Sequence, residues 1–104
     1  MEHAVIAHLR LIDDKFGSER ERTAVAALTD DLERVISEEQ AGEFDGEEFG
    51  DGRCVLYMYG PDADRLFEVV EPILKLAPLA RGGFAIKRYG EASDANAQEA
   101  RVTW

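Results

Sequence analysis

The side chains best suited to chemistry lie two residues apart on two short alternating segments. His8 and Arg10 belong to the run AVIAHLRLI, and Tyr57 and Tyr59 belong to RCVLYMYG. Because successive side chains of a strand point to opposite faces, each pair shares one face. A histidine beside an arginine suits acid–base chemistry or ligand binding, but no third group at local spacing completes a catalytic triad. These residues therefore predict a binding surface and no catalytic residue.

A run of carboxylates is the second candidate for chemistry. Between Arg34 and Arg53 the chain carries acids but no basic residue, namely Glu38, Glu39, Glu43, Asp45, Glu47, Glu48 and Asp51. Such a cluster suits a basic protein partner or a hard cation such as Ca²⁺. Its spacing does not match an EF-hand loop, so we predict no metal. The alternative is a solvated acidic face on an acidic protein.

The composition argues against several classes of function. The 104 residues carry 22 acidic and 12 basic side chains, a formal net charge of −10. This charge opposes binding to nucleic acid or to an anionic membrane, although GRCVLYMY superficially resembles the aromatic third strand of an RNA recognition motif. The sequence shows no zinc spacing, phosphate-binding loop or dinucleotide fingerprint, so we predict no cofactor. A single cysteine and the lack of a signal-peptide pattern predict a cytoplasmic protein.

The strongest local pattern runs from a strand into a helix. Residues 53–59 alternate, and we expect the even-numbered side chains to face the core, which makes Cys54 an inert buried thiol. Gly60-Pro61 ends the strand, and Pro61 suits the first position of a helix. One apolar stripe marks that helix, and Pro72 within it should kink or split it.

A strand and a helix precede this segment. Residues 4–12 alternate between an apolar and a mixed face. Ser18 and Glu21 match a capping box at the start of a helix. This helix should end near Gln40, with Gly42 as its C-terminal cap.

The segment of residues 43–49 has weak strand propensity, but it leads through a hairpin turn into the strong strand. A three-residue turn over 50–52 faces Phe44 toward the core, whereas a two-residue turn would bury the carboxylates of Asp45 and Glu47. Burying unpaired carboxylates is costly, so we predict the three-residue turn.

The C-terminal part of the chain contributes a further strand over residues 83–89. We expect Phe84 and Ile86 to point inward, and Ala85, Lys87 and Tyr89 to point outward. Residues 91–104 form an extension, with a helical turn over 95–100 capped by Asp94 and a short edge strand over 101–104.

The resulting order β-α-β-β-α-β predicts a ferredoxin-like plait. Two right-handed β-α-β units interleave into a four-stranded antiparallel sheet with both helices on one face. The expected order of strands across the sheet is four, one, three, two. Residues 1–104 would form a single domain of this α+β class.

In such a plait the face of the sheet away from the helices is open. Strand by strand, we expect this open face to carry Lys87 and Tyr89, then His8 and Arg10, then Tyr57 and Tyr59, then Glu43, Asp45 and Glu47. A contiguous aromatic patch typically marks a binding surface. A gradient from basic to acidic is also self-complementary under a two-fold rotation, as a homodimer requires. The alternative is an ordinary solvated face with half-buried tyrosines.

Three runs, FDGEEFGDG, YMYGPDADRLF and IKRYG, resemble a group of small uncharacterised bacterial α/β proteins. The resemblance covers roughly the part of the chain beyond the first helix, and YGPDAD is its most specific run. It implies a compact α/β domain. It carries over no catalytic residue and no activity.

Together these patterns predict a small acidic interaction or regulatory protein that forms a homodimer through the open face. One concrete version is an inhibitor of the immunity type, which covers a basic partner with the acidic cluster. The alternative is a small enzyme or ligand-binding domain with a pocket over the sheet, lined by His8, Arg10, Tyr57 and Tyr59.

Overall fold

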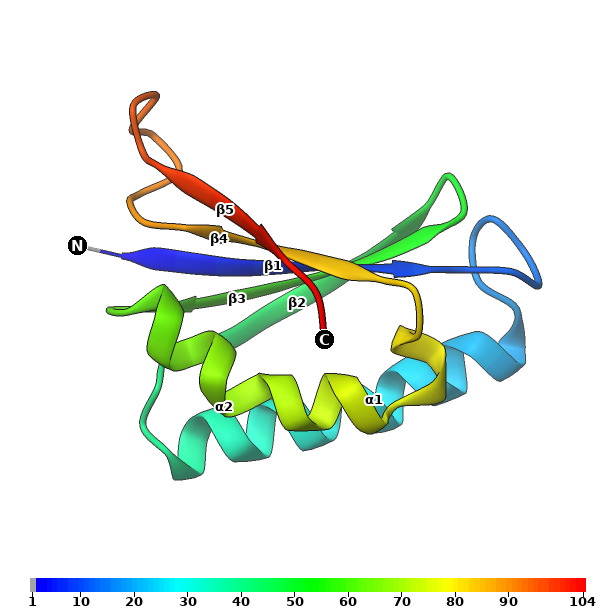
Figure 1. Ribbon diagram of the computed structural model, residues 1–104. Coiled ribbons are helices and arrows are strands. Elements are labelled where there is room, and N and C mark those ends of the chain that lie inside the picture. Colours follow the sequence, from blue (N-terminus) through cyan, green and yellow to red (C-terminus); the bar gives the residue numbers. More distant parts are fainter. Residues whose placement is uncertain (1) are drawn as a thin grey trace.

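The computed structural model describes residues 2–104, which form an α+β fold with an antiparallel sheet (Figure 1). The strands are β1 (His3–Arg10), β2 (Glu43–Gly50), β3 (Arg53–Gly60), β4 (Phe84–Arg88) and β5 (Glu99–Val102). The helices are α1 (Glu19–Glu38) and α2 (Ala63–Leu76), and a short 3₁₀ turn, η1 (Pro78–Ala80), follows α2. The order across the sheet is β2-β3-β1-β4-β5, and every neighbouring pair is antiparallel.

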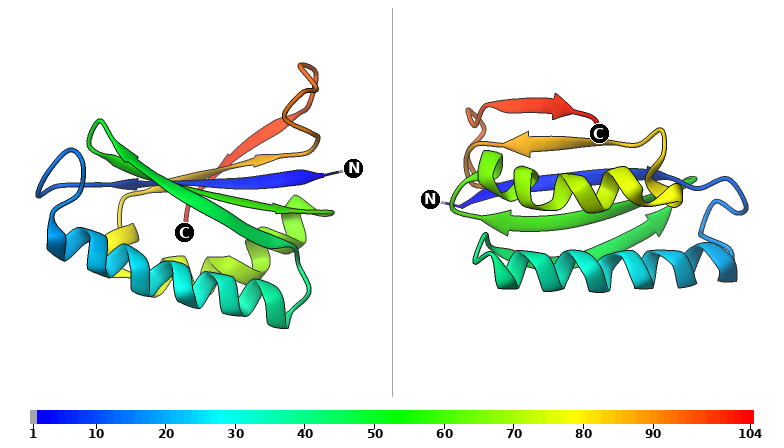
Figure 2. Two further views of the ribbon diagram at one scale, coloured as in Figure 1. Left: turned by 180° about the vertical axis from the view of Figure 1, so that it is seen from behind. Right: turned by 60° about the horizontal axis from the view of Figure 1, so that its bottom comes forward.

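Both helices lie on the same side of the sheet, as the views from two further directions agree (Figure 2). The other face carries no helix within residues 2–104. We call it the open face. Neither helix of the described chain is long and apolar enough to cross a membrane.

The core fills the space between the helices and the covered face of the sheet. Cys54, Leu56 and Met58 of β3 are each 0% exposed, and the side chains between them are partly exposed. The predicted orientation of β3 is therefore confirmed. The helices close the core with the buried stripes Val25, Leu28, Leu32 and Ile36 of α1 and Leu66, Val70 and Leu74 of α2.

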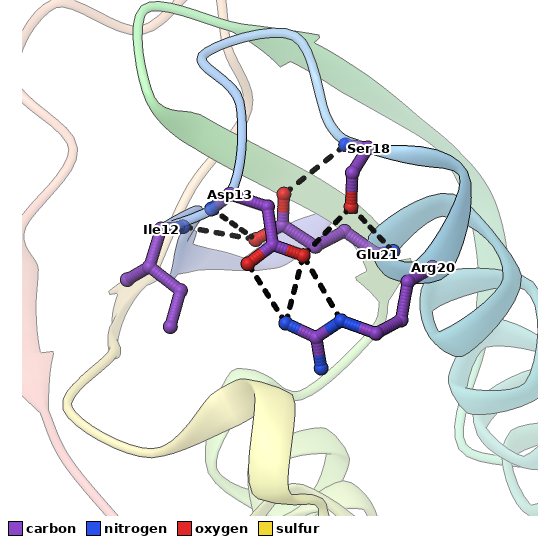
Figure 3. A network of polar contacts seen from close by, with 5 residues as sticks. All are labelled: Ile12, Asp13, Ser18, Arg20 and Glu21. Atoms are coloured by element: carbon purple, nitrogen blue, oxygen red, sulfur yellow. Dashed lines mark hydrogen bonds and ion pairs between the residues drawn. The ribbon is translucent and has the colours of Figure 1, made fainter.

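A polar network holds the loop between β1 and α1 (Figure 3). The capping box is present as predicted, because Ser18 Oγ accepts the N–H of Glu21 and Glu21 Oε1 accepts the N–H of Ser18, both at 3.1 Å. The other carboxylate oxygen of Glu21 reaches back to the N–H groups of Ile12, at 2.9 Å, and Asp13, at 3.3 Å. Asp13 in turn accepts a hydrogen bond from Ser18 Oγ and forms an ion pair with Arg20. One carboxylate thus ties the end of β1 to the first turn of α1.

The C-terminal end of α1 differs from the prediction. Gln40, with φ of 51°, takes the left-handed position, and Ala41 N–H bonds to the carbonyl of Ile36. This pattern is a Schellman motif centred on Gln40. Gly42 is therefore not the cap. Its backbone passes against the carbonyl of Tyr59, where a Cβ has no room.

Helix α2 begins two residues later than predicted, at Ala63 instead of Pro61. Asp62 is the N-cap, and its Oδ1 accepts the N–H groups of Asp64 and Arg65, so Pro61 precedes the helix instead of opening it. A side chain that satisfies two free N–H groups outweighs the preference of proline for the first position. The helix continues across Pro72, and its ribbon changes direction after the first turns (Figure 1).

The hairpin between β2 and β3 has a two-residue turn and not the predicted three-residue turn. Asp51 and Gly52 both have positive φ, and Gly50 pairs with Arg53. A bulge at Asp45 then restores the predicted pairing of Phe44 with Met58. The bulge removes the objection to the short turn, because Asp45 leaves the ladder and remains exposed.

The orientation predicted for β4 is wrong. Ala85 pairs with Ala7 and is 0% exposed, so Ala85, Lys87 and Tyr89 lie on the helix side, while Phe84 and Ile86 lie on the open face. Trp104, and not Phe84, packs against the core on the helix side of the sheet. Its Nε1 donates to the carbonyl of Ala80 at 2.9 Å.

The C-terminal extension also differs in detail. The predicted helical turn over 95–100 is wrong, because residues 91–98 form turns, in which Asp94 accepts the N–H groups of Asn96 and Ala97. The predicted edge strand over 101–104 is present as β5, shifted toward the N-terminus, and it pairs with β4.

Candidate binding face of the sheet

The centre of the open face is apolar and aromatic. Cross-strand pairing places six such side chains on it, namely Ile6, Val55, Tyr57, Tyr59, Phe84 and Ile86. All six are partly exposed, and neither helix covers them. An uncovered apolar surface of this kind is typical of an interaction site.

The structure brings together most of the residues predicted for this face. His8 and Arg10 of β1 share it with Tyr57 and Tyr59 of β3. Lys87 and Tyr89 do not belong to it, because β4 has the opposite orientation. On β4 and β5 the open face carries instead Phe84, Ile86, Arg88, Glu99 and Arg101.

The acidic edge of the face also changes in composition. Glu43 pairs with Tyr59 on the open face, as predicted. Glu47 pairs with Leu56 and so turns to the helix side, whereas its neighbour Glu48 joins the open face. Tyr57 Oη donates to Glu48 Oε1 at 2.6 Å, and this bond raises the pKa of Tyr57. The β2 edge of the open face is therefore acidic, whereas the other strands carry four arginines, Arg10, Arg53, Arg88 and Arg101, and one acid, Glu99.

His8 sits in a stack of flat side chains. Its ring is 4.7 Å from the ring of Phe84 and nearly parallel to it, and the guanidinium of Arg101 lies 3.8 Å from the centre of Phe84 on the same open face. Burial lowers the pKa of His8, and the charges of Arg53 and Arg101 lower it further. The imidazole is therefore neutral near pH 7, and its buried Nδ1 has no hydrogen-bond partner within residues 2–104.

Lys87 and Tyr89 form a separate cluster at the N-terminus of α2. Lys87 Nζ donates to Asp64 Oδ1 at 2.8 Å, and Tyr89 Oη donates to the same oxygen at 2.6 Å. These bonds lower the pKa of Asp64 and raise those of Lys87 and Tyr89. His3 Nδ1 accepts the N–H of Ala63 beside them. The cluster fastens β4 to α2, and sequence reasoning missed it because its members lie more than 20 residues apart.

The residues of the predicted acidic cluster are distributed over the end of α1, strand β2 and the turn that follows it. Glu38 pairs with Arg34 along α1, and Glu39 pairs with Arg65 of α2. Glu43, Asp45, Glu47 and Glu48 follow the length of β2, which is an edge strand, and Asp51 lies in the turn after it. Within the described chain no group of three His, Cys, Asp or Glu side chains could hold a metal ion.

Cys54 should be unreactive while the protein is folded. Burial raises the pKa of its thiol to about 12, and the nearby Glu47 carboxylate contributes in the same direction. At about pH 8 we expect the thiolate population to be about a thousandfold smaller than that of a free cysteine, and iodoacetamide labelling to be slower by at least that factor. Mass spectrometry gives a direct reading, because Cys54 is the single cysteine. Labelling as fast in buffer as in urea would contradict the buried thiol.

Comparison with protein-family models, with curated proteins and with solved structures finds no match to this chain, so the resemblance of FDGEEFGDG, YMYGPDADRLF and IKRYG stays an expectation.

Proposed function

We propose that the protein is an interaction protein of the ferredoxin-like class that forms a homodimer through the open face of its sheet. The order β2-β3-β1-β4 within the sheet supports the class, because it is the order that two interleaved β-α-β units produce. The uncovered apolar centre of the open face carries the functional proposal. Covering it with a second copy removes apolar side chains from water, which is favourable in proportion to their area.

The charges at the two sides of the open face support a second copy as the occupant. Glu43 and Glu48 lie on β2 at one edge, and Arg88 and Arg101 lie toward the other edge together with one acid, Glu99 of β5. A two-fold axis parallel to the strands sets β2 of one copy over β4 and β5 of the other. Each acidic edge then lies over strands that carry Arg88, Arg101 and Glu99, a net positive charge of one, and this happens twice by symmetry.

Replacing Ile86 with glutamate is expected to convert the dimer into a folded monomer. The new carboxylate would lie in the middle of the contact and would be desolvated there, which is costly for an unpaired charge. In the monomer it lies beside Arg101 in solvent, so the fold should tolerate it. Light scattering coupled to size exclusion should show twice the chain mass for the wild-type protein and the chain mass for Ile86→Glu.

The matched control is Leu76→Glu. Leu76 is 84% exposed at the end of α2, on the helix side of the molecule, and the substitution changes the charge in the same way. This variant should remain dimeric. A wild-type protein that is monomeric, or an Ile86→Glu protein that remains dimeric, would overturn the proposal.

The second candidate function is binding of a basic protein partner by the acids of β2. Glu38 and Glu39 already have arginine partners, which leaves fewer carboxylates free for another protein. Charged side chains along an edge strand also have a simpler role, because they discourage further strands from pairing with it. The acidic edge therefore favours the dimer contact over an inhibitor function.

A further inference from the structure

Three arginines converge at one end of the open face. Arg10 and Arg53 are directly opposite each other on β1 and β3, and Arg101 extends from β5 over Phe84. Together with His8 and Phe84 they line a pocket of about 300 Å³ that is open to solvent. Like charges directly opposite on antiparallel strands repel each other, so this arrangement costs stability in the isolated chain.

None of these three arginines has a carboxylate within 4 Å in the part of the chain that the structure describes. Of the six other arginines, Arg20, Arg34 and Arg65 pair with carboxylates. Arg22 and Arg88 donate instead to backbone carbonyls. Arg10, Arg53 and Arg101 differ in that they lie together around one pocket. The chain has 22 acids for 12 basic residues, so a shortage of carboxylates does not explain the unpaired cluster. The charges that lower the pKa of His8 come from this same cluster, which shows a locally positive potential inside an acidic protein.

We propose that this arginine pocket binds a small molecule through a phosphate group. Guanidinium groups offer paired N–H donors that match the oxygens of a phosphate, and three of them suit a dianion better than a single carboxylate. The half-buried rings of His8 and Phe84 also line the pocket, and Arg101 lies over the Phe84 ring. The bounded volume and the net charge of −10 favour a small ligand over a nucleic acid.

The loop network positions the pocket. Leu11 N–H bonds to the carbonyl of Gly52 at 2.8 Å, and Gly52 N–H bonds to the carbonyl of Lys15 at 2.9 Å. These bonds attach the β2–β3 turn to the loop that Glu21 holds (Figure 3). The backbones that carry Arg10 and Arg53 are therefore fixed before any ligand arrives. A fixed site loses less conformational entropy on binding.

The test is a titration of the ¹⁵N-labelled full chain with inorganic phosphate at constant ionic strength. We expect saturable shifts of the amide signals of Gly52, Arg53 and Gly83, which border the pocket. Arg53→Gln should weaken binding by about tenfold or more, because it removes a charge-assisted pair of hydrogen bonds. This variant should fold at least as stably as the wild-type protein, since it relieves the repulsion with Arg10.

The control is Arg34→Gln, which removes the same charge from α1, far from the pocket in the sequence and on another element. It should leave phosphate affinity unchanged. Acetate at the same ionic strength should bind more weakly than phosphate, and equal affinity for both would show a carboxylate site instead. Shifts that do not saturate, or equal losses in Arg34→Gln and Arg53→Gln, would overturn the proposal.

Discussion

Replacing Glu21 with glutamine is expected to destabilise the protein more than any other charge-neutralising substitution in the first turn of α1. Glu21 is 1% exposed, and its two oxygens accept N–H groups from Ile12, Asp13 and Ser18. A glutamine side chain keeps one oxygen but turns the other into an NH₂ group that faces an N–H donor. The loss should exceed the roughly 1 kcal/mol expected for removing the cap with Ser18→Ala. Urea unfolding of the wild-type protein, Glu21→Gln and Ser18→Ala measures the free energy of unfolding of each and so gives the comparison.

Glu19 provides the matched control for this substitution. It also lies in the first turn of α1 and is exposed to solvent. Glu19→Gln removes the same charge near the helix N-terminus, which costs about 0.3–1 kcal/mol at the surface. If Glu19→Gln and Glu21→Gln lowered the free energy of unfolding equally, the loss would come from the interaction with the helix dipole and not from the hydrogen bonds of the loop network.

The same network gives acid sensitivity a definite sign. Burial alone would raise the pKa of Glu21, but the backbone N–H groups together outweigh it and lower the pKa. The unfolded chain therefore takes up a proton at a higher pH than the folded one. The stabilisation by Glu21 is complete above the ordinary glutamate pKa of about 4.3 and is lost as the pH falls through the lower folded value. The stability difference between wild type and Glu21→Gln should shrink over that range.

Short-range patterns made the first turn of α1 predictable. Ser18 and Glu21 are three residues apart, so the capping box follows from helix geometry alone. The second role of Glu21 was not predictable in this way. Its partners Ile12 and Asp13 belong to a loop whose path depends on where β1 ends. The same limit applies to Asp64 and Lys87, which meet only through the packing of α2 on β4.

The orientation of β3 was predictable and that of β4 was not, for one physical reason. In β3 one face carries Cys54, Leu56 and Met58, and the other carries Arg53 and two tyrosine hydroxyl groups, so only one orientation keeps charged and hydroxyl groups out of the core. In β4 both orientations offer apolar residues, and the rule that apolar side chains point inward chose Phe84 and Ile86. That rule fails where the open face is itself apolar, and this apolar character is the feature on which the proposed binding surface rests.

The bulge in β2 was not predicted from the sequence, for a related reason. Phe44 and Phe49 are five residues apart, so a regular strand would place them on opposite faces. In the structure they pair with Met58 and Cys54 and both face the helices, because Asp45 is left out of the ladder. The predicted three-residue turn satisfied Phe44 alone. A strand with an extra residue satisfies both aromatic side chains at the cost of one unpaired position.

Replacing Gly42 with alanine is expected to produce the second large loss of stability. Gly42 has φ of 147°, which an L-residue adopts only under strain, and a Cβ there would collide with the carbonyl oxygen of Tyr59. Gly60 faces the same close crossing from the other side, against the carbonyl of Ala41. Backbone strain and the forced separation of the two segments should together cost about 2–6 kcal/mol. That range is a large part of the total stability of a domain of this size, about 5–15 kcal/mol.

Gly46 separates the two contributions. It has the same φ of 147°, but a Cβ there would meet no atom within 4 Å. Gly46→Ala should therefore cost only the strain, about 1–3 kcal/mol, and the difference between the two variants measures the collision. Urea unfolding of both proteins provides this difference. Equal losses would mean that the backbone at residues 41–42 can move away from residues 59–60 without further cost. The contact between these two segments would then not hold in place the pair of Glu43 and Tyr59 at the start of β2.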